Sequence, residues 1–328
     1  MAARLVQLNF SIKSDLNLKF AGEEDRWTFQ MYHISRIPFE VEENDQYLTL
    51  FSENPANDFL ILVEEILELF ECPNIHRVCI STCSSRRTVK SFVPWMNKTN
   101  LEIQNIFLAF IDDELFKFIL TSYEKPFKGL ETQGGGCLNT PQKLQFDYLN
   151  AEWAGQWLTL EQLFALDCRE INMGYISISI EEINLFLKSW KEGKTNNRLE
   201  QISIRFDYGK TADWNVILKG LEPKVSDLMT TKRKYVKTIG STKGTYWLHG
   251  GLDIQRDDGT IATIFHLCFV SSEENTEIPQ VTIDYFEKYR DKDWNSGEVE
   301  IEDGEAEEEA RRMGLLMPKR RFEMVVFE

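Results

Sequence analysis

The sequence of 328 residues lacks an apolar run long enough to cross a lipid bilayer. It also lacks the unbroken apolar segment of a secretory signal, because residues 1–20 interleave polar and charged residues with apolar ones. Several of the six cysteines lie inside apolar, strand-like patterns, as buried free thiols do. We therefore expect no association with a membrane, and a reducing location in the cytoplasm or the nucleus.

Basic residues are scarce as well. The chain has 37 lysines and arginines against 53 aspartates and glutamates, which gives a net charge of −16. A protein that binds nucleic acid needs a basic face to neutralise phosphates, so we exclude nucleic acid as a partner. The acidic balance is compatible with a basic protein partner, and equally with a charge that serves only solubility.

The sequence has no group with the spacing of a zinc site. Cys72, His76, Cys79 and Cys83 lie close together, but no close cysteine pair is matched by a second pair. On a strand, His76 and Cys79 would also point to opposite faces. We interpret this group as structural thiols and expect no bound metal.

Groups that would support catalysis are equally sparse. His33, His249 and His266 are isolated in the sequence, so they indicate no acid–base dyad. A cysteine nucleophile at Cys83 or Cys137 would need a base that the sequence does not identify. The glycine-rich stretches lack the lysine and hydroxyl spacing of a phosphate-binding loop. We expect no catalytic residue and no cofactor.

What the chain does contain is a recurring signature, apolar-x-x-apolar-x-apolar. Its copies begin at Ile75, Ile103, Phe127, Cys168 and Leu199, and a weaker copy lies at 143–149. The copy at Phe127 is degenerate, because Thr132 takes its last apolar place. A helix-like segment precedes nearly every copy. Recurrence of one helix-plus-strand unit at about two to three dozen residues is typical of a solenoid.

The fold class predicted is α/β: a leucine-rich-repeat-like solenoid of helix–strand units with parallel strands and right-handed crossovers. Apolar residues at helical spacing predict helices over 57–70, 89–96 and 113–121. Two capping boxes, Thr159 with Gln162 and Ser179 with Glu182, predict two more helix starts. Gly193 is placed to end the second of these helices.

The two ends of the chain are predicted to be rich in β-strands. Strand patterns occur at 5–10, 16–20, 27–34 and 47–51, and again at 246–256, 260–269 and 322–327. The run 298–309 holds eight acidic residues, and we expect a solvated loop there. This pattern gives a β-rich N-terminal cap over 1–56, a repeat region over 57–206 and a β-rich C-terminal cap over 207–328.

In a curved sheet, the residues between the signature positions point away from the core, and they are the candidate partner-binding residues. They are Arg77, Ser81, Asn105, Phe107, Glu131, Glu170, Asn172, Gln201, Ser203 and Arg205. The alternative is that this face is only solvated, or covered by the C-terminal region. Trp153 and Trp294 are candidates for exposed anchors, since an exposed tryptophan often binds a partner.

Several blocks resemble one known family. They lie at 32–39, 157–163, 167–168, 183–190, 199–202, 250–259 and 262–264. The most specific block places Asn184, Phe186, Leu187, Lys188 and Trp190 together. In this order the blocks resemble the F-box-associated domain, type 2, of nematode F-box proteins, and the likeness spans most of the chain.

The resemblance implies a substrate receptor of an SCF-type cullin ubiquitin ligase. An F-box would bind a Skp-family adaptor and a cullin, and the associated domain would hold a client protein for ubiquitination. Strand-like sequence follows Met1 almost at once, so the F-box itself is expected to be absent from this chain. Adaptor and cullin are then partners only if the natural protein carries an F-box. The alternatives are a binding protein without a ligase link, such as an inhibitor, decoy or antidote, and an enzyme, which would need a deep pocket with convergent titratable groups.

Overall fold

The computed structural model divides into two compact units, Met1–Leu138 and Asn139–Glu328. The residues it describes are 3–10, 14–20, 26–33, 47–69, 74–81, 86–134, 146–152, 155–207, 211–239, 242–301, 304–316 and 318–327. The division falls inside the predicted repeat region 57–206, and the three-part division of the chain stays a prediction. Each unit is an open sheet with helices.

The sheet of the first unit mixes two strand directions. Its strands are β1 (Ala3–Phe10), β2 (Ser14–Phe20), β3 (Arg26–His33), β4 (Tyr47–Ser52), β5 (Asn74–Ser81), β6 (Glu102–Ala109) and β7 (Gly129–Gln133), in the order β7-β6-β5-β1-β2-β3-β4. The hairpin pairs β1–β2 and β2–β3 are antiparallel. The pairs β3–β4, β1–β5, β5–β6 and β6–β7 are parallel.

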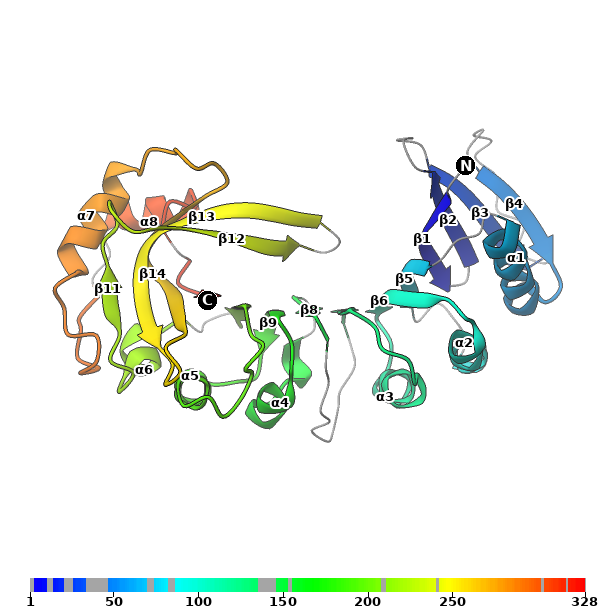
Figure 1. Cartoon of the computed structure of the whole chain (residues 1–328), viewed down its shortest axis with the longest axis horizontal. Helices are drawn as coiled ribbons and strands as arrows, with labels where there is room; N and C mark the ends of the chain where they lie inside the picture. The colour runs from blue at the N-terminus through cyan, green and yellow to red at the C-terminus, as the bar shows by residue number, and fades with distance from the viewer. Residues whose placement is uncertain are drawn as a thin grey trace. The chain divides into compact units, whose positions relative to one another are not determined.

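The three helices expected in this unit are present. They are α1 (Pro55–Leu69), α2 (Arg86–Lys98) and α3 (Asp113–Ser122). In α1 the apolar side chains Phe59, Val63 and Ile66 are buried on one face. The carboxylate of Asp112 caps α3 by accepting a hydrogen bond of 2.9 Å from the backbone N–H of Leu115. Figure 1 shows α2 and α3 on one side of β5 and β6, so the helices cover one face of that sheet.

The sheet of the second unit is parallel at one end and antiparallel at the other. Its strands are β8 (Tyr148–Ala151), β9 (Glu170–Ile176), β10 (Gln201–Phe206), β11 (Lys224–Ser226), β12 (Lys232–Ile239), β13 (Thr242–Gln255), β14 (Ile261–Ser271) and β15 (Arg321–Phe327). They follow the order β11-β13-β14-β15-β10-β9-β8, and β12 pairs with β13. The pairs β8–β9 and β9–β10 are parallel, whereas β10–β15, β15–β14 and β14–β13 are antiparallel. The fold class is therefore mixed α/β, and a solenoid of parallel strands is not established.

Two helices of the second unit begin where the capping boxes predicted. Its helices are η1 (Gly155–Trp157), α4 (Leu160–Ala165), α5 (Ile180–Lys191), α6 (Trp214–Leu218), α7 (Gln280–Tyr289) and α8 (Glu305–Arg312). Thr159 and Gln162 form the reciprocal cap of α4, and Ser179 and Glu182 form that of α5. Gly193 follows α5 with φ +67°, a left-handed conformation that glycine adopts without strain.

The recurring signature marks the core of both sheets. Its positions are buried at Ile75, Val78, Ile80, Ile103, Ile106, Leu108, Leu130, Cys168, Ile171, Met173, Leu199, Ile202 and Ile204. The degenerate copy differs as its sequence suggests: Phe127 is only half-buried, and the hydroxyl-bearing Thr132 is buried in place of an apolar residue. Burial of this stripe against the helices supplies much of the driving force for folding.

Two expectations need correction, and a third is not tested. The acidic run is not only a loop, because Glu305–Arg312 forms α8. Three of its acids lie in the first turn and its two arginines in the last, an order that interacts favourably with the helix dipole. Trp294 is not an exposed anchor but is 2 % exposed, with its ring 4.8 Å from that of His266. Trp153 lies outside the described residues.

Candidate functional site

The strands β8, β9 and β10 carry a row of polar side chains on the face away from the core. Alternation places Gln201, Ser203 and Arg205 of β10 on the side opposite to Ile202 and Ile204. In the parallel ladder, Ser203 pairs with Asn172, and Gln201 pairs with Glu170. We call the set Tyr148, Asn150, Glu170, Asn172, Gln201, Ser203 and Arg205 the polar face. All five of the residues predicted for this unit belong to it.

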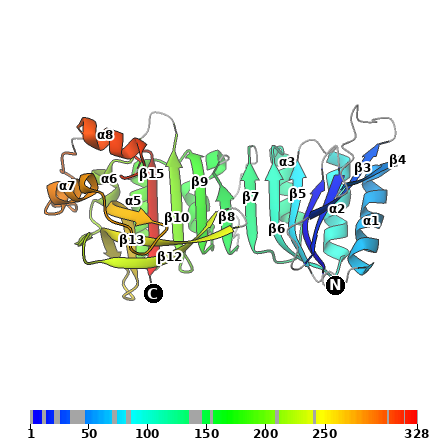
Figure 2. The same cartoon turned by 90° about the horizontal axis from the view of Figure 1, so that it is seen from above.

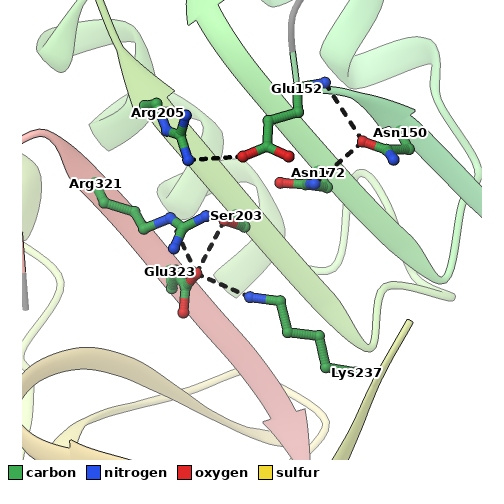
Figure 3. A network of polar contacts seen from close by, with 8 residues as sticks. All are labelled: Asn150, Glu152, Asn172, Ser203, Arg205, Lys237, Arg321 and Glu323. Carbon is green, nitrogen blue, oxygen red and sulfur yellow. Dashed lines mark hydrogen bonds and ion pairs between the residues drawn. The ribbon is translucent and has the colours of Figure 1, made fainter. Parts of the chain in front are cut away.

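Neighbouring strands of the polar face are joined by hydrogen bonds between their side chains (Figure 3). Asn172 Nδ2 donates to Asn150 Oδ1 at 3.1 Å. Arg205 Nη2 lies 2.6 Å from Glu152 Oε1, an ion pair that links the end of β10 to the residue after β8. These contacts fix side chains that would otherwise be mobile at the surface, so the face is preorganised.

Glu323 is the charged centre of the same face. Its Oε1 accepts a hydrogen bond of 3.0 Å from Ser203 Oγ and forms ion pairs with Lys237 Nζ at 3.0 Å and Arg321 Nε at 3.2 Å. Glu323 is 4 % exposed, which would be costly for a carboxylate without such partners. Lys237 and Arg321 balance its negative charge, and the Ser203 hydroxyl donates a hydrogen bond to it. The charge of Glu323 is therefore compensated within the chain.

A two-stranded arm passes over part of this face. The arm consists of β12 and residues 242–249 of β13, and Figures 1 and 2 show it crossing above β9 and β10. A pocket lies between Lys237 of the arm and strands β8–β10. Its lining side chains include Asn150, Glu170, Asn172, Gln201 and Ser203. The polar groups around it are amides, a hydroxyl, the Glu170 carboxylate and the Lys237 ammonium, and the cavity volume is only about 20 Å³.

Gln201 stands out within this pocket. Its side chain is 4 % exposed, yet neither Oε1 nor Nε2 has a hydrogen-bond partner in the part of the chain that the structure describes. Most buried polar groups in folded proteins are paired with protein atoms or with ordered water, and the space beside Gln201 is large enough for about one water.

The candidates of the first unit form their own cluster. Arg77 Nη2 lies 2.7 Å from Glu131 Oε2, and the Arg77 guanidinium carbon lies 4.6 Å from the ring centroid of Phe107. Asn105 Nδ2 donates to the backbone oxygen of His76 at 2.8 Å and is 7 % exposed. Ser81 ends β5 and is half-buried. Three of the five predicted residues of this unit thus contact one another.

Sequence reasoning missed Asn150, Glu152, Lys237, Arg321 and Glu323. Asn150 directly follows the weak copy of the signature at 143–149, so that copy held the signal. Glu323 lies in the strand predicted over 322–327, but its partner Ser203 is 120 residues away, which no local pattern reveals. Lys237 lies on β12, a strand that the sequence analysis did not predict.

The thiols and histidines have structural surroundings. Burial raises the pKa of Cys168 to about 12, and it also raises the pKa of Cys268. Neither thiol is therefore ionised near neutral pH, so neither has the character of a nucleophile. His76 Nδ1 lies 3.1 Å from Gln104 Oε1, and Cys72 and Cys83 lie outside the described residues. Among the residues that the structure describes, no group of three metal-ligating side chains occurs.

Within the described part of the chain, no helix is long and apolar enough to cross a bilayer. The longest, α1, has 15 residues, which at 1.5 Å per residue reach about 22 Å, against about 30 Å for the hydrocarbon core.

Comparison with known proteins gives one match. Residues 140–204 match the family described as F-box associated, which confirms the resemblance over this segment. The segment contains β8, η1, α4, β9 and α5 and most of β10, so it includes the three strands of the polar face. No curated protein and no solved structure shows significant similarity to the chain.

Proposed function

We propose that this chain, which carries an F-box-associated segment at residues 140–204, is a protein-binding module that recognises the client of an SCF-type ubiquitin ligase. The proposal is supported by the position of the matched segment in the fold. The segment that matches the family includes the strands whose side chains form the polar face and the pocket beneath the arm. A match to the F-box-associated family supports a role in binding another protein, and the polar face is the surface that we propose binds it.

The proposed mechanism is proximity. The module holds a client protein while a separate enzyme transfers ubiquitin, so the chain itself performs no bond chemistry. The same proposal includes a leucine-rich-repeat-like arrangement of the helix–strand units and a location in the cytoplasm or nucleus. A Skp-family adaptor and a cullin join the assembly only if the natural protein carries an F-box.

The side chains proposed to contact the client are those of the polar face and the cluster in the first unit. In the first unit they are Arg77, Ser81, Asn105, Phe107 and Glu131, with Phe107 supplying the aromatic contact. In the second unit they are Glu170, Asn172, Gln201, Ser203 and Arg205. Ion pairs and amide hydrogen bonds already hold many of these side chains, which lowers the entropy lost on binding.

Capture of partners by the full-length natural protein, with a cross-linker and a proteasome inhibitor, tests the proposal. We expect recovery of the adaptor, a cullin and one dominant client. Asn172→Arg, which places a bulky charge on the polar face, is expected to lose the client and keep the adaptor. Leu185→Arg is the matched control, because Leu185 is 51 % exposed on α5, and it is expected to keep both.

Equal recovery of the client by Asn172→Arg and the unchanged protein would show that the polar face is not the client site. A stoichiometric partner without adaptor or cullin, whose cellular level does not respond to the protein, would instead support the inhibitor or decoy function.

A further inference from the structure

The strand β12 has one edge without a partner strand. In the described part of the chain, β12 pairs only with β13. The N–H of Gly250 on β13 donates to the backbone oxygen of Thr231, just before β12, at 3.1 Å. Along an antiparallel ladder, residues that bond across to the partner alternate with residues whose N–H and C=O point away from it. Counting from Thr231, the backbone groups of Lys232, Lys234 and Val236 point to the other side of β12, which we call the free edge.

A groove runs along the free edge. Lys234, Tyr235 and Val236 line a cavity of about 600 Å³, and Lys234 also lines a cavity of about 770 Å³. Both cavities are lined by Thr260 and Phe327 as well, so they form one groove. Consecutive side chains of a strand point to opposite faces, so the part of β12 that all three residues share with the groove is its edge. Binding sites commonly measure about 300–1,000 Å³, so this groove has room for several residues of an extended segment.

The charges of the groove are compensated, with one exception. Each arginine that lines it pairs with a carboxylate: Arg169 with Glu200, Arg198 with Asp147 and Asp167, Arg233 with Asp253, and Arg256 with Asp258. Lys234 lies within ion-pair distance of no carboxylate among the described residues, and its ammonium lies 5.7 Å from the centroid of the Trp247 ring. The ammonium of Lys232 lies 5.0 Å from the same ring but also 3.5 Å from Glu274. The uncompensated cation of the free edge is therefore Lys234.

These features define the class of partner. A strand added to a free edge gains main-chain hydrogen bonds, and side chains that lie directly opposite each other interact. An acidic side chain opposite Lys234 gains a counter-ion, and an apolar one opposite Val236 covers a side chain that is 49 % exposed. A second copy of this chain would instead bring the lysines of two such edges near each other, which is unfavourable.

We propose that the free edge of β12 binds an extended, acidic segment of another protein as an added antiparallel strand. The segment lies in the groove, pairs its main chain with Lys232, Lys234 and Val236, and places a carboxylate opposite Lys234. The inference goes beyond the proposed function, because it concerns a surface other than the polar face and holds with or without a link to a ligase.

Random 12-residue peptides displayed on phage supply the probe. They are selected on the full chain at about 150 mM salt, where the Debye length of about 8 Å limits repulsion by the net charge of −16. Peptides that also bind Val236→Pro are removed. This proline deletes an N–H that points away from β13, a position where an edge strand tolerates proline. Val236→Thr keeps the N–H and the branched side chain, and it is expected to bind the selected peptide within twofold of the unchanged protein.

Lys234→Glu tests the charge. We expect it to weaken binding of the selected peptide about fivefold, because an attractive cross-strand pair becomes a repulsive one. With lysine in place of the facing acidic residue of the peptide, Lys234→Glu is expected to bind better than the unchanged protein. Lys117→Glu, at an exposed lysine of α3, is the matched control, since it changes the net charge equally. It is expected to bind the selected peptide within twofold of the unchanged protein.

Methylation of single backbone nitrogens in the peptide tests the main-chain contact. Only alternate N–H groups of an added strand point toward β12. We therefore expect binding to weaken at least tenfold at every second position of the paired stretch and less than threefold at the positions between.

The inference is overturned if no peptide survives the removal step, if Lys234→Glu binds the peptide as Lys117→Glu does, or if methylation shows no two-residue period. The last two results decide the question even if Val236→Pro does not fold. Capture of adaptor and client by the full-length protein tests the ligase function separately.

Discussion

Glu323 links strands that are distant in the sequence. It lies on β15, accepts a hydrogen bond from Ser203 of β10 and pairs with Lys237 of the arm. The ion pair to Lys237 attaches the arm to the sheet, and the pocket lies between these two parts. This ion pair adds to the apolar contacts that Tyr235 and Leu248 of the arm make in the cluster with Phe265 and Val325.

Replacing the Glu323 carboxylate tests the contribution of this ion pair. Glu323→Gln keeps the shape of the side chain but leaves Lys237 and Arg321 without their counter-charge. Both cations are partly exposed, at 17 % and 27 % of the side chain, so water offsets part of the loss. We expect a decrease in the free energy of unfolding of about 1–3 kcal/mol, measured by urea denaturation.

The control for this change is Glu274→Gln, which removes an exposed partner of Lys232 that lies 3.5 Å away. Surface ion pairs contribute about 0–1 kcal/mol, so the control is expected to change stability little. Equal effects of the two substitutions would show that Glu323 does not hold the arm.

His249 makes stability depend on pH in a defined direction. Burial, and then the neighbouring Lys232 ammonium, lower the pKa of His249 in the folded chain. The unfolded chain titrates near the ordinary value of about 6.5 and so binds more protons below that pH. The contribution to stability is therefore complete above about pH 6.5 and declines as the pH falls below it.

His249→Asn removes this titration, and we expect the variant to lose less stability than the unchanged protein between about pH 7 and pH 5. Urea denaturation at both pH values measures the difference. For each protein, the quantity compared is the change in the free energy of unfolding between the two pH values. A loss of packing against Phe269 that is the same at both pH values therefore cancels. An equal or larger loss in the variant would contradict the assignment.

At the scale of elements, the strands and helices with a regular apolar pattern or a capping box could be predicted from the sequence. The signature identified β5, β6, β9 and β10, and the capping boxes identified the starts of α4 and α5. It did not predict β12, because the segment is dense in lysine and arginine and carries little apolar alternation. Long-range pairing supplies what is missing there: β12 is held by β13 and by the contact of Lys237 with Glu323.

The candidate site was predicted in part for the same reason. Alternation along β9 and β10 placed Glu170, Asn172, Gln201, Ser203 and Arg205 on one face, and this is where they lie. The pocket is also lined by Lys237 of the arm. The sequence did not reveal this contact, because β12 was not predicted and it meets the polar face only through the tertiary fold. The C-terminal region was named as an alternative cover for the face, and the arm does cover part of it.

The capping box of α5 gives an element-scale prediction. Ser179 Oγ accepts the N–H of Glu182 at 3.2 Å, and Glu182 Oε2 accepts the N–H of Ser179 at 2.7 Å. Ser179→Ala is expected to lower the free energy of unfolding by about 1 kcal/mol, because one donor at the start of the helix loses its partner. Ser179→Asp restores an acceptor and is expected to stay within about 0.5 kcal/mol of the unchanged protein. If aspartate destabilises as much as alanine, the cap does not stabilise this helix.

At the scale of the whole molecule, the binding surface and the chain differ in charge. The chain has a net charge of −16, which at low salt attracts any basic protein. The network around the pocket instead contains Arg205, Lys237 and Arg321 against Glu152 and Glu323, with Glu170 beside them. Three cations and three carboxylates leave this surface without a net charge. The client that we propose would be recognised there mainly by hydrogen bonds, and attraction by the net charge of the chain would be separate and nonspecific.

Salt separates the two contributions. The Debye length falls from about 14 Å near 50 mM salt to about 6 Å near 300 mM, so attraction to the whole chain is screened over this range. Binding at the polar face is expected to change by less than threefold, because its charges pair at distances well below the screening length. Calorimetry with the captured client at the two salt concentrations measures this dependence. A fall in affinity of more than tenfold would mean that the client is held by the net charge of the chain.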